Sequence, residues 1–337
     1  MVGKLTDYED ETRRRELFRR AEAVRQEYYG KDVYIRGLIE FTNYCKNDCY
    51  YCGIRASNHH IRRYRLDEEE ILTCCKKGYR LGFRTFVLQG GEDPLYTPEK
   101  TASLVECIKR AYPDCALTLS VGEHPRQVYK QWFDAGADRY LLRHETADEE
   151  HYRKLHPASC SPENRKRCLW DLKEIGYQVG CGFMVGSPGQ RPEHLEKDIK
   201  FICDLQPDMV GIGPFIPQSD TPFGRESAGN LELTLVLLAM IRVLLPSVLL
   251  PATTALGTLH RQGLEMGIQA GANVCMPNLT PDAVRDQYAL YEGKTVENGG
   301  MKDEKQALDA LKERMEKIGY RIVEGRGDRK NFVKISR

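Results

Sequence analysis

The chain contains 337 residues, of which 41% are hydrophobic and 29% are charged, a globular mixture that argues against a disordered or fibrous chain. Fifty Lys and Arg residues against 49 Asp and Glu residues give a net charge of +1, so no global electrostatic attraction draws it to nucleic acid or to a membrane. The chain begins with polar residues and lacks the apolar core and small-residue cleavage site of a secretion signal. We therefore expect a cytoplasmic protein with reduced thiols.

Helical and strand patterns alternate along the chain. Residues 7–29 predict a charged amphipathic helix. Eight apolar runs predict strands, at residues 34–41, 84–89, 116–121, 139–143, 178–184, 209–213, 249–254 and 273–276. Helical patterns lie between them, at residues 67–80, 98–111, 125–135, 162–176, 192–204, 231–245 and 258–270. This alternation predicts an α/β fold, a (β/α)8 TIM-type barrel with an N-terminal helix and a C-terminal helical extension.

The pattern divides the chain into three segments: an N-terminal helical segment at 1–30, the barrel at 31–290 and a C-terminal extension at 291–337. The extension predicts one helix over about 302–319, followed by a basic tail, GRGDRKNFVKISR, that we expect to lie in solvent. The longest apolar stretch runs from Leu231 to Leu250, but two charges and a proline interrupt it. We expect a buried helix followed by a buried strand there, and no membrane span.

In a barrel of this kind, functional residues lie at the carboxyl ends of the strands. The segments that end or follow the eight predicted strands are Cys45–Cys52, Gln89–Asp93, Ser120–Glu123, Arg143–Glu145, Met184–Gly186, Gly213–Phe215, Thr253–Thr254 and Met276–Asn278. Polar and glycine residues recur in these segments, although loops also need them for turning.

The chain has 12 cysteines, and nine are scattered, as expected for small buried hydrophobic residues. The other three, Cys45, Cys49 and Cys52, form a C-x3-C-x2-C motif directly after the first strand. Three thiolates in one loop can bind three irons of a 4Fe–4S cluster and leave the fourth iron open for a small molecule. Structural zinc is the alternative, since His59 or His60 could supply a fourth ligand.

This motif, with an aromatic residue directly before its last cysteine, resembles the signature of the radical S-adenosylmethionine (SAM) enzymes. More closely, the chain resembles the FeFe-hydrogenase maturase family HydE, in the biotin synthase-like group. The resemblance spreads over residues 34–291 and is carried by IEFTNYCKNDCYYCGIR (39–55), VLQGGEDP (87–94), RYLLRHETA (139–147), MVGIGPFIP (209–217), PATTALGT (251–258) and GANV (271–274).

The resemblance implies that SAM chelates the open iron and is reductively cleaved to a 5′-deoxyadenosyl radical, chemistry that belongs to the cofactor. The implied cluster ligands, and the residues at the centre of catalysis, are Cys45, Cys49 and Cys52. The implied SAM contacts are Tyr51, beside the adenine, and Gln89, Gly91, Glu92, Ser120, Glu145, Arg165 and Met184. Arginine suits a carboxylate and glutamate suits ribose hydroxyls, although Glu145 and Arg165 could simply form salt bridges.

By the same resemblance, Arg143, Thr253 and Thr254 match the polar lining of a substrate cavity. Met209, Tyr288 and Tyr291 match positions near the bound substrate, although the two tyrosines could simply pack the barrel end. The implied reaction is a step in building the binuclear iron site of FeFe-hydrogenase, acting on a cysteine-bound iron carbonyl cyanide unit. The implied partners are this small molecule and other hydrogenase maturases with a reductant protein, and neither nucleic acid nor membrane.

Three alternatives remain open at this stage. Methylornithine synthase carries the same signature but acts on lysine. Biotin synthase needs cysteines facing inward on several barrel strands, and the predicted second and third strands contain none. An iron–sulfur carrier without catalysis would not need Gly91, Glu92 and Arg165. The last cysteine is Cys275, so the C-terminal region has no thiolates for the second cluster that some HydE members carry, and we expect a single cluster.

Overall fold

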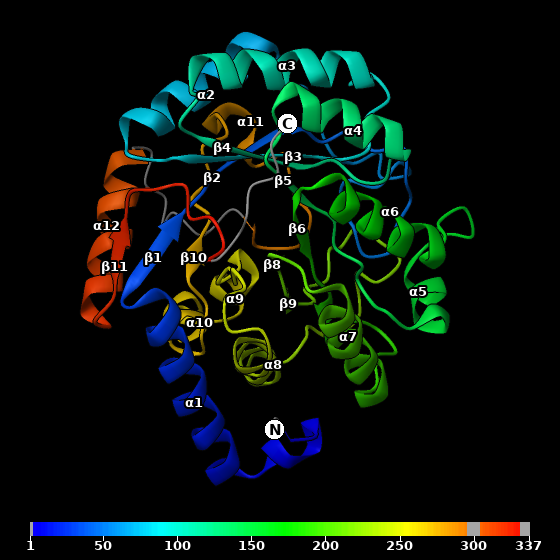
Figure 1. Cartoon of the computed structure of the whole chain (residues 1–337). Coiled ribbons are helices and arrows are strands. Elements are labelled where there is room, and N and C mark those ends of the chain that lie inside the picture. Colours follow the sequence, from blue (N-terminus) through cyan, green and yellow to red (C-terminus); the bar gives the residue numbers. More distant parts are fainter. Residues whose placement is uncertain (1–2, 295–303, 331–337) are drawn as a thin grey trace.

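A computed structural model describes residues 3–294 and 304–330 of the chain (Figure 1). The strands of the barrel wall are β1 (Asp32–Ile35), β2 (Gly37–Thr42), β3 (Thr85–Gly90), β4 (Ala116–Ser120), β5 (Arg139–Leu141), β6 (Gln178–Cys181), β7 (Met184–Val185), β8 (Met209–Val210), β9 (Gly213–Pro214) and β10 (Val274–Cys275). The helices around them are α2 (Glu68–Arg80), α3 (Pro98–Ala111), α4 (Arg126–Ala135), α5 (Glu149–Leu155), α6 (Pro162–Ile175), α7 (Pro192–Leu205), α8 (Leu231–Leu244), α9 (Thr254–Leu259), α10 (Gly263–Gln269) and α11 (Asp282–Arg285).

The strands close into a ring in which every pairing of neighbouring strands is parallel. Strands β2, β3, β4, β5, β6 and β8 form one sheet in that order. Parallel bridges then join Met209 to Leu249 and Pro251 to Val274, and β10 pairs with β1. The predicted (β/α)8 barrel is therefore confirmed, and its carboxyl-end mouth is the place to look for a site.

Local sequence explains where the helices begin and end. Asp67 caps α2, and Glu70 returns the bond to the Asp67 backbone in a capping box. Ser161 and Asn230 cap α6 and α8 by accepting from backbone N–H groups three residues on. Gly176 ends α6 in the left-handed region, which glycine adopts without strain.

Two predicted elements near the end of the barrel are wrong in detail. The single helix expected over 258–270 is two short helices, α9 and α10. Here Gly263 approaches Leu256 so closely that a Cβ would lie 2.0 Å from the Leu256 carbonyl oxygen, which requires the chain to turn between them. The strand expected over 249–254 is reduced to the two bridges at Leu249 and Pro251, because proline has no N–H to donate to a ladder.

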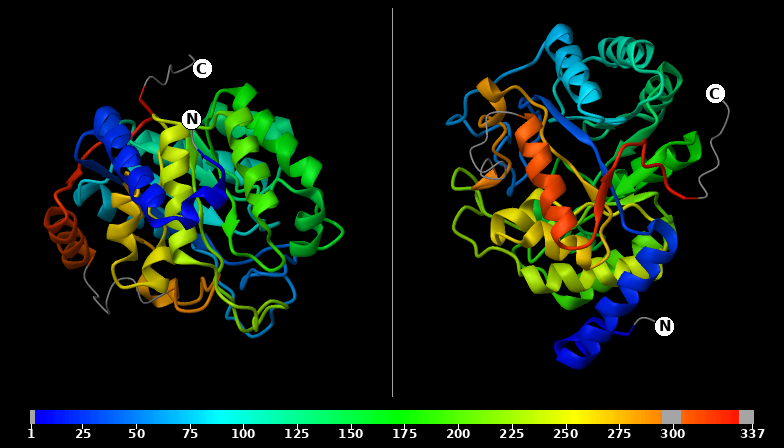
Figure 2. Two further views of the ribbon diagram at one scale, coloured as in Figure 1. Left: turned by 90° about the horizontal axis from the view of Figure 1, so that it is seen from below. Right: turned by 90° about the vertical axis from the view of Figure 1, so that its left-hand side faces the viewer.

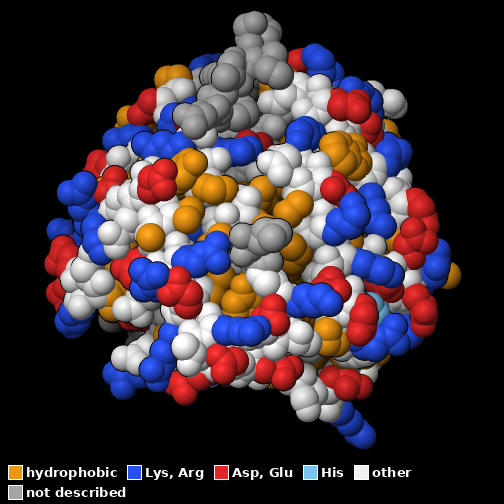
Figure 3. Space-filling view, turned by 60° about the horizontal axis from the view of Figure 1, so that its bottom comes forward, with side chains coloured by type: hydrophobic (Ala, Val, Ile, Leu, Met, Phe, Trp, Pro, Cys, Tyr) orange, Lys and Arg blue, Asp and Glu red, His pale blue; other side chains and the backbone are white. Residues whose placement is uncertain are grey.

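The apolar stretch from Leu231 to Leu250 is a buried helix, α8, followed by buried strand-like residues, as expected. Before the barrel come a 3-10 turn, η1 (Leu5–Glu9), and α1 (Glu11–Tyr29), which lies beside α8 (Figure 2). In the described part of the chain no helix is both long and apolar enough to cross a bilayer. Acidic and basic side chains alternate over the face shown in Figure 3, in keeping with a net charge near zero.

The C-terminal extension is more than a helix. Helix α12 (Glu304–Lys317) lies within the predicted range, but β11 (Arg321–Val323) follows it and pairs in parallel with β1. Strand β1 precedes β2, and it is β2 that pairs with β3. The edge of β1 on that side therefore has no barrel strand beside it and pairs with β11.

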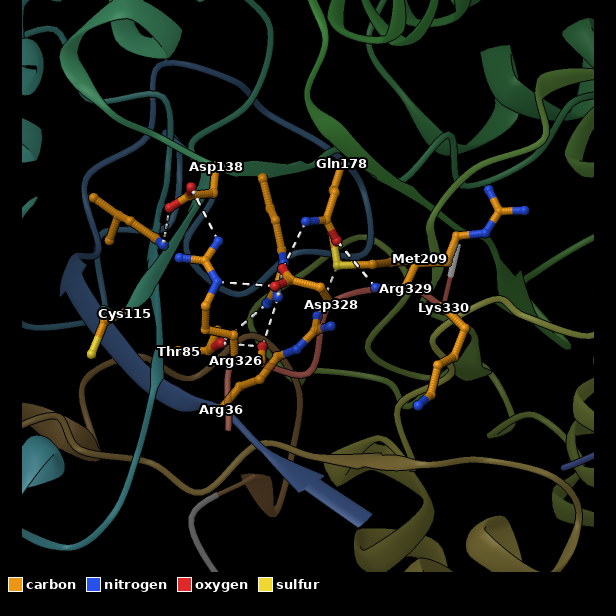
Figure 4. A network of polar contacts seen from close by, with 12 residues as sticks. Arg36, Thr85, Cys115, Asp138, Gln178, Met209, Arg326, Asp328, Arg329 and Lys330 are labelled. Carbon is orange, nitrogen blue, oxygen red and sulfur yellow. Dashed lines mark hydrogen bonds and ion pairs between the residues drawn. The ribbon is translucent and has the colours of Figure 1, made fainter. Parts of the chain in front are cut away.

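The tail from residue 325, expected in solvent, instead crosses the amino ends of the strands as far as it is described (Figure 4). Asp328 accepts from Arg139 at 2.7 Å and from Gln178 at 2.8 Å, while Arg326 pairs with Asp138 at 3.2 Å. The expectation is wrong because the strands begin with buried polar groups that need partners, and the basic and acidic tail supplies them. Residues 331–337 of this tail lie outside the described residues.

Candidate active site

The loop that carries the three motif cysteines is held in shape from within. One guanidinium, that of Arg63, donates to four backbone carbonyls of the loop: those of Asn43, Ile54, Arg55 and Asn58. The Tyr50 N–H also donates to the Leu155 carbonyl at 3.0 Å, which ties the loop to the end of α5. The thiols therefore stand on a loop that the protein's own hydrogen bonds hold in shape.

The thiols themselves lie at the mouth of the barrel and are half-buried. Burial raises the pKa of Cys52 to about 12 and also raises the pKa of Cys45. Such thiols stay protonated at neutral pH unless a cation binds them, so metal binding must release protons here.

The donor set fits a cluster better than a zinc ion. No three His, Cys, Asp or Glu side chains in the described ranges are grouped closely enough to hold a single metal ion. An iron–sulfur cluster spreads its thiolates over separate irons and does not need them to meet at one point. Of the two possible zinc ligands, His60 pairs with Asp220 at 2.8 Å and His59 is exposed. Neither is grouped with the motif cysteines in the described ranges.

The turn after β3 packs directly against this loop. At Gly91 an added Cβ would lie 2.3 Å from the Tyr44 carbonyl oxygen and 2.5 Å from the Cys45 Cβ, so only glycine fits. Glu92 follows; its backbone carbonyl accepts from the Lys46 N–H at 3.0 Å, and one of its carboxylate oxygens accepts from the Glu123 N–H at 2.9 Å. The expected SAM amino-group region is therefore a tight backbone cradle beside Cys45.

Two of the expected SAM contacts, Glu145 and Arg165, form ion pairs, but not with each other. Arg165 pairs with Glu123 and donates to the Arg143 carbonyl at 2.8 Å. Glu145 Oε2 lies 3.1 Å from Arg143 Nη2, without the alignment of a hydrogen bond, and both of these buried atoms have no hydrogen-bond partner. Glu145 also has a backbone φ of 63°, an unusual conformation for a residue other than glycine.

Several buried polar atoms of the site have no hydrogen-bond partner, which indicates the kind of ligand that fits there. Buried polar atoms are nearly always hydrogen-bonded, so the Glu145 carboxylate, the Arg143 guanidinium and the Thr253 hydroxyl call for a polar ligand. A carboxylate that accepts and a guanidinium that donates suit a ribose and an anion respectively. Together with the Gly91 cradle and the three thiols, the residues present fit a 4Fe–4S cluster with SAM.

The aromatic residue of the motif is enclosed. Tyr51 packs beside a small apolar cluster that contains Met184, the residue expected at the methionine end of SAM. Its hydroxyl lies 3.1 Å from His156 Nε2. Ser120 ends β4, next to Gln89 in the β3–β4 register.

The residues expected around the substrate divide into two levels. Tyr288 is buried near Gln89, and Thr254 Oγ1 lies 2.5 Å from the Tyr291 hydroxyl, so the substrate residues Thr254, Tyr288 and Tyr291 are held near the mouth. Met209, at the start of β8, lies lower, where its sulfur accepts from Arg36 at 2.8 Å.

The structure adds three residues that the sequence patterns did not single out. Glu123 neutralises Arg165, and its position after the third strand was the only signal for it. His156 contacts Tyr51, and a lone histidine carries no pattern. Cys160, grouped with the scattered cysteines, lies close enough to Cys49 for the two thiols to shift each other's pKa: the pKa of Cys49 is raised and that of Cys160 is lowered to about 7.

Comparison with known proteins shows which families the chain resembles. The family model of the radical SAM superfamily matches residues 39–202. The [FeFe] hydrogenase maturase subunit HydE of Thermotoga maritima is 49% identical over 82% of this chain and 79% of its own length. The 3-methylornithine synthase of Methanosarcina acetivorans is 32% identical over 86% of this chain and 81% of its own length. Among solved structures, methylornithine synthase (PylB) superposes with a TM-score of 0.83 at 28% identity, covering 95% of this chain and 92% of that one.

Proposed function

The chain belongs to the radical SAM superfamily and, within it, to the HydE hydrogenase maturases, and on that basis we propose that it acts in assembling the active-site cluster of FeFe-hydrogenase. The observation that carries the proposal is 49% identity to HydE over 82% of the chain. The C-x3-C-x2-C loop at the barrel mouth agrees with it. The catalytic unit in this proposal is the barrel of residues 31–290, flanked by segments 1–30 and 291–337.

In this proposal Cys45, Cys49 and Cys52 hold one 4Fe–4S cluster. When bound, the cluster and SAM supply a 5′-deoxyadenosyl radical by reductive cleavage. The chain's own residues bind and orient: the Gly91–Glu92 cradle receives the amino group, and Glu145, whose Oε2 faces Arg143 without a hydrogen bond, accepts from the ribose. Tyr51 and Met184 enclose the adenine and methionine ends, and Gln89 and Ser120 complete the polar wall.

Arg165 is the residue expected to bind the SAM carboxylate, and its ion pair with Glu123 orients its guanidinium. With the guanidinium pre-oriented by an ion pair and by the Arg143 carbonyl, SAM binding needs little side-chain ordering.

The substrate we propose is a cysteine-bound iron carbonyl cyanide unit. Support comes from the Arg143 guanidinium and the Thr253 hydroxyl, each with an unpartnered buried atom, which suit an anionic ligand. Thr254, Tyr288 and Tyr291 complete the proposed substrate wall, and Met209 lies lower, against Arg36. Other hydrogenase maturases and a reductant protein are the partners this reaction requires.

The test is 5′-deoxyadenosine formation after anaerobic reconstitution and reduction. We expect product from the parent protein and from Cys203→Ala, a cysteine on α7 outside the site, and none from Cys49→Ala. Equal product from Cys49→Ala would refute the proposal that the cluster loop catalyses SAM cleavage. Supplying the iron–cysteine substrate and, separately, lysine distinguishes HydE activity from methylornithine synthesis, which the similarity to PylB makes the second candidate.

An iron–sulfur carrier has one specific observation in its favour, the nearness of Cys160 to Cys49, since a fourth thiol could close the cluster. Electron paramagnetic resonance (EPR) of the reduced protein decides between the two. An enzyme cluster changes its signal when SAM is added. A signal that ignores SAM in the parent and responds in Cys160→Ala would establish the carrier instead.

A further inference from the structure

His156 is buried at the end of α5 and is held on several sides. It is 1% exposed, and its backbone N–H donates to the Tyr152 carbonyl at 3.1 Å, which closes the helix. Its ring stacks on the Tyr152 ring with centroids 3.9 Å apart and an interplanar angle of 18°. The ring therefore has one position and one orientation.

The hydrogen bonds of the ring define its tautomer. Nδ1 lies 2.9 Å from the Tyr152 carbonyl oxygen, which can only accept, so Nδ1 carries the proton. Burial, with the Arg165 guanidinium nearby, lowers the pKa of His156 to about 3, so the ring is neutral. The other nitrogen, Nε2, then has a lone pair, and it accepts from the Tyr51 hydroxyl at 3.1 Å.

Two contacts thus connect the end of α5 to the cysteine loop. One is the backbone bond from Tyr50 to Leu155, and the other is the Tyr51 hydroxyl bond to His156. The imidazole meets the Tyr51 ring edge-on, with centroids 5.3 Å apart and an interplanar angle of 88°. Because the backbone is fixed on one side and the hydroxyl on the other, the Tyr51 side chain cannot swing about its Cα–Cβ bond without breaking this part-buried hydrogen bond, and the edge-on imidazole limits rotation of the ring plane.

We propose that His156 is a positioning residue that fixes the Tyr51 ring in the orientation that receives the adenine of SAM. The inference rests on the proposed function, because it takes the aromatic residue of the motif as the adenine contact. His156 acts only through Tyr51 and touches neither cofactor nor substrate.

Two substitutions separate the two hydrogen bonds of His156. In His156→Asn the amide can still donate to the Tyr152 carbonyl from the Nδ1 position but cannot reach Tyr51. In His156→Gln the longer amide can replace Nε2 as the acceptor for the Tyr51 hydroxyl. SAM affinity is read from the change in the reduced-cluster EPR signal as SAM is added, with iron content and the signal without SAM as controls.

We expect His156→Asn and Tyr51→Phe each to weaken SAM binding about tenfold, as expected for one lost buried hydrogen bond. The double variant should be no weaker than either single one, since both remove the same bond. His156→Gln should stay within about twofold of the parent. Iron content and the SAM-free signal should not change in any variant.

Parental affinity in His156→Asn, or additive losses in the double variant, would overturn the proposal. Loss of the cluster in both His156→Asn and His156→Gln would also overturn it, because the role would then be in folding. A parent cluster that ignores SAM would overturn the proposed function as well, so the two failures are distinct.

Discussion

Asp328, at the amino end of the barrel, offers the sharpest test of how the tail is held (Figure 4). Its carboxylate accepts from Arg139 at 2.7 Å, Gln178 at 2.8 Å and Arg326 at 2.9 Å. The Arg139 side chain is 0% exposed and that of Asp328 is 35% exposed. The change to make is Asp328→Asn, which keeps the shape and removes the charge.

Breaking a fully buried ion pair costs about 3–5 kcal/mol. Two facts reduce that figure here. Asp328 is partly in water, which screens its charge, and Arg139 keeps its bonds to Thr85 and to the Arg326 carbonyl. We therefore expect a loss of about 1.5–3 kcal/mol in the free energy of unfolding at pH 7, the range of one hydrogen bond to a charged group.

The pH dependence follows from the direction of the pKa shift. Burial alone would raise the pKa of Asp328, but Arg139, Arg326 and Gln178 outweigh it and lower the pKa below its usual range. The stabilisation is therefore fully present above about pH 4, near the pKa of the unfolded chain, and is lost as pH falls through the folded pKa. The difference between parent and variant should be constant from pH 7 to 5 and shrink below pH 4.

Urea unfolding followed by circular dichroism measures these differences. Asp134→Asn is the matched control, because its carboxylate is 52% exposed and pairs only with Lys130 on the same helix. We expect that control to lose less than about 0.5 kcal/mol. An equally small loss in Asp328→Asn, or a difference between parent and variant that grows on acidification, would show that the Asp328 charge does not stabilise the fold.

Three further predictions concern other parts of the barrel. Gly91→Ala should lower iron content after reconstitution because the new Cβ collides with the Cys45 loop. Gly325→Ala, with nothing within 4 Å of its new Cβ, should load iron normally, and equal iron in both variants would show that the close packing of Gly91 on this loop is not required. His151 is buried and its pKa is lowered to about 4 by burial, so acidification from pH 7 to 5 should destabilise the parent by about 2 kcal/mol more than His151→Gln; parallel slopes in the two proteins would contradict this. Arg36→Met should raise the free energy of unfolding by about 1–4 kcal/mol in urea titration, because Arg36 Nε and Nη2 are buried without partners; a loss of more than about 1 kcal/mol would show that the charge stabilises the fold.

The regular elements of the barrel were predictable because each depends on local pattern. Apolar runs and helical periodicity predicted β3, α3 and α8 to within two residues, and the caps lie beside them in the sequence. Prediction failed where a distant contact decides the backbone. The turn that splits α9 from α10 exists because Gly263 packs on Leu256, and the tail leaves solvent because Asp138, Arg139 and Gln178 are buried elsewhere in the chain.

The candidate site divides in the same way. The cysteine motif is local, so spacing alone indicated its chemistry and the resemblance named its cofactor. The choice of partners is not local: Arg165 pairs with Glu123 and not with Glu145, and Tyr51 bonds to His156, more than a hundred residues away in the chain.

Local sequence alone specifies the class of the protein, the alternating barrel and the loop of three thiols, because periodicity and short spacings are properties of adjacent residues. The folded chain was needed to show which charges meet at the mouth, that Cys160 lies close enough to Cys49 to shift its pKa, and that the last described residues close the amino end of the barrel. These outcomes depend on burial, which obliges each polar group to find a partner wherever the fold has placed one.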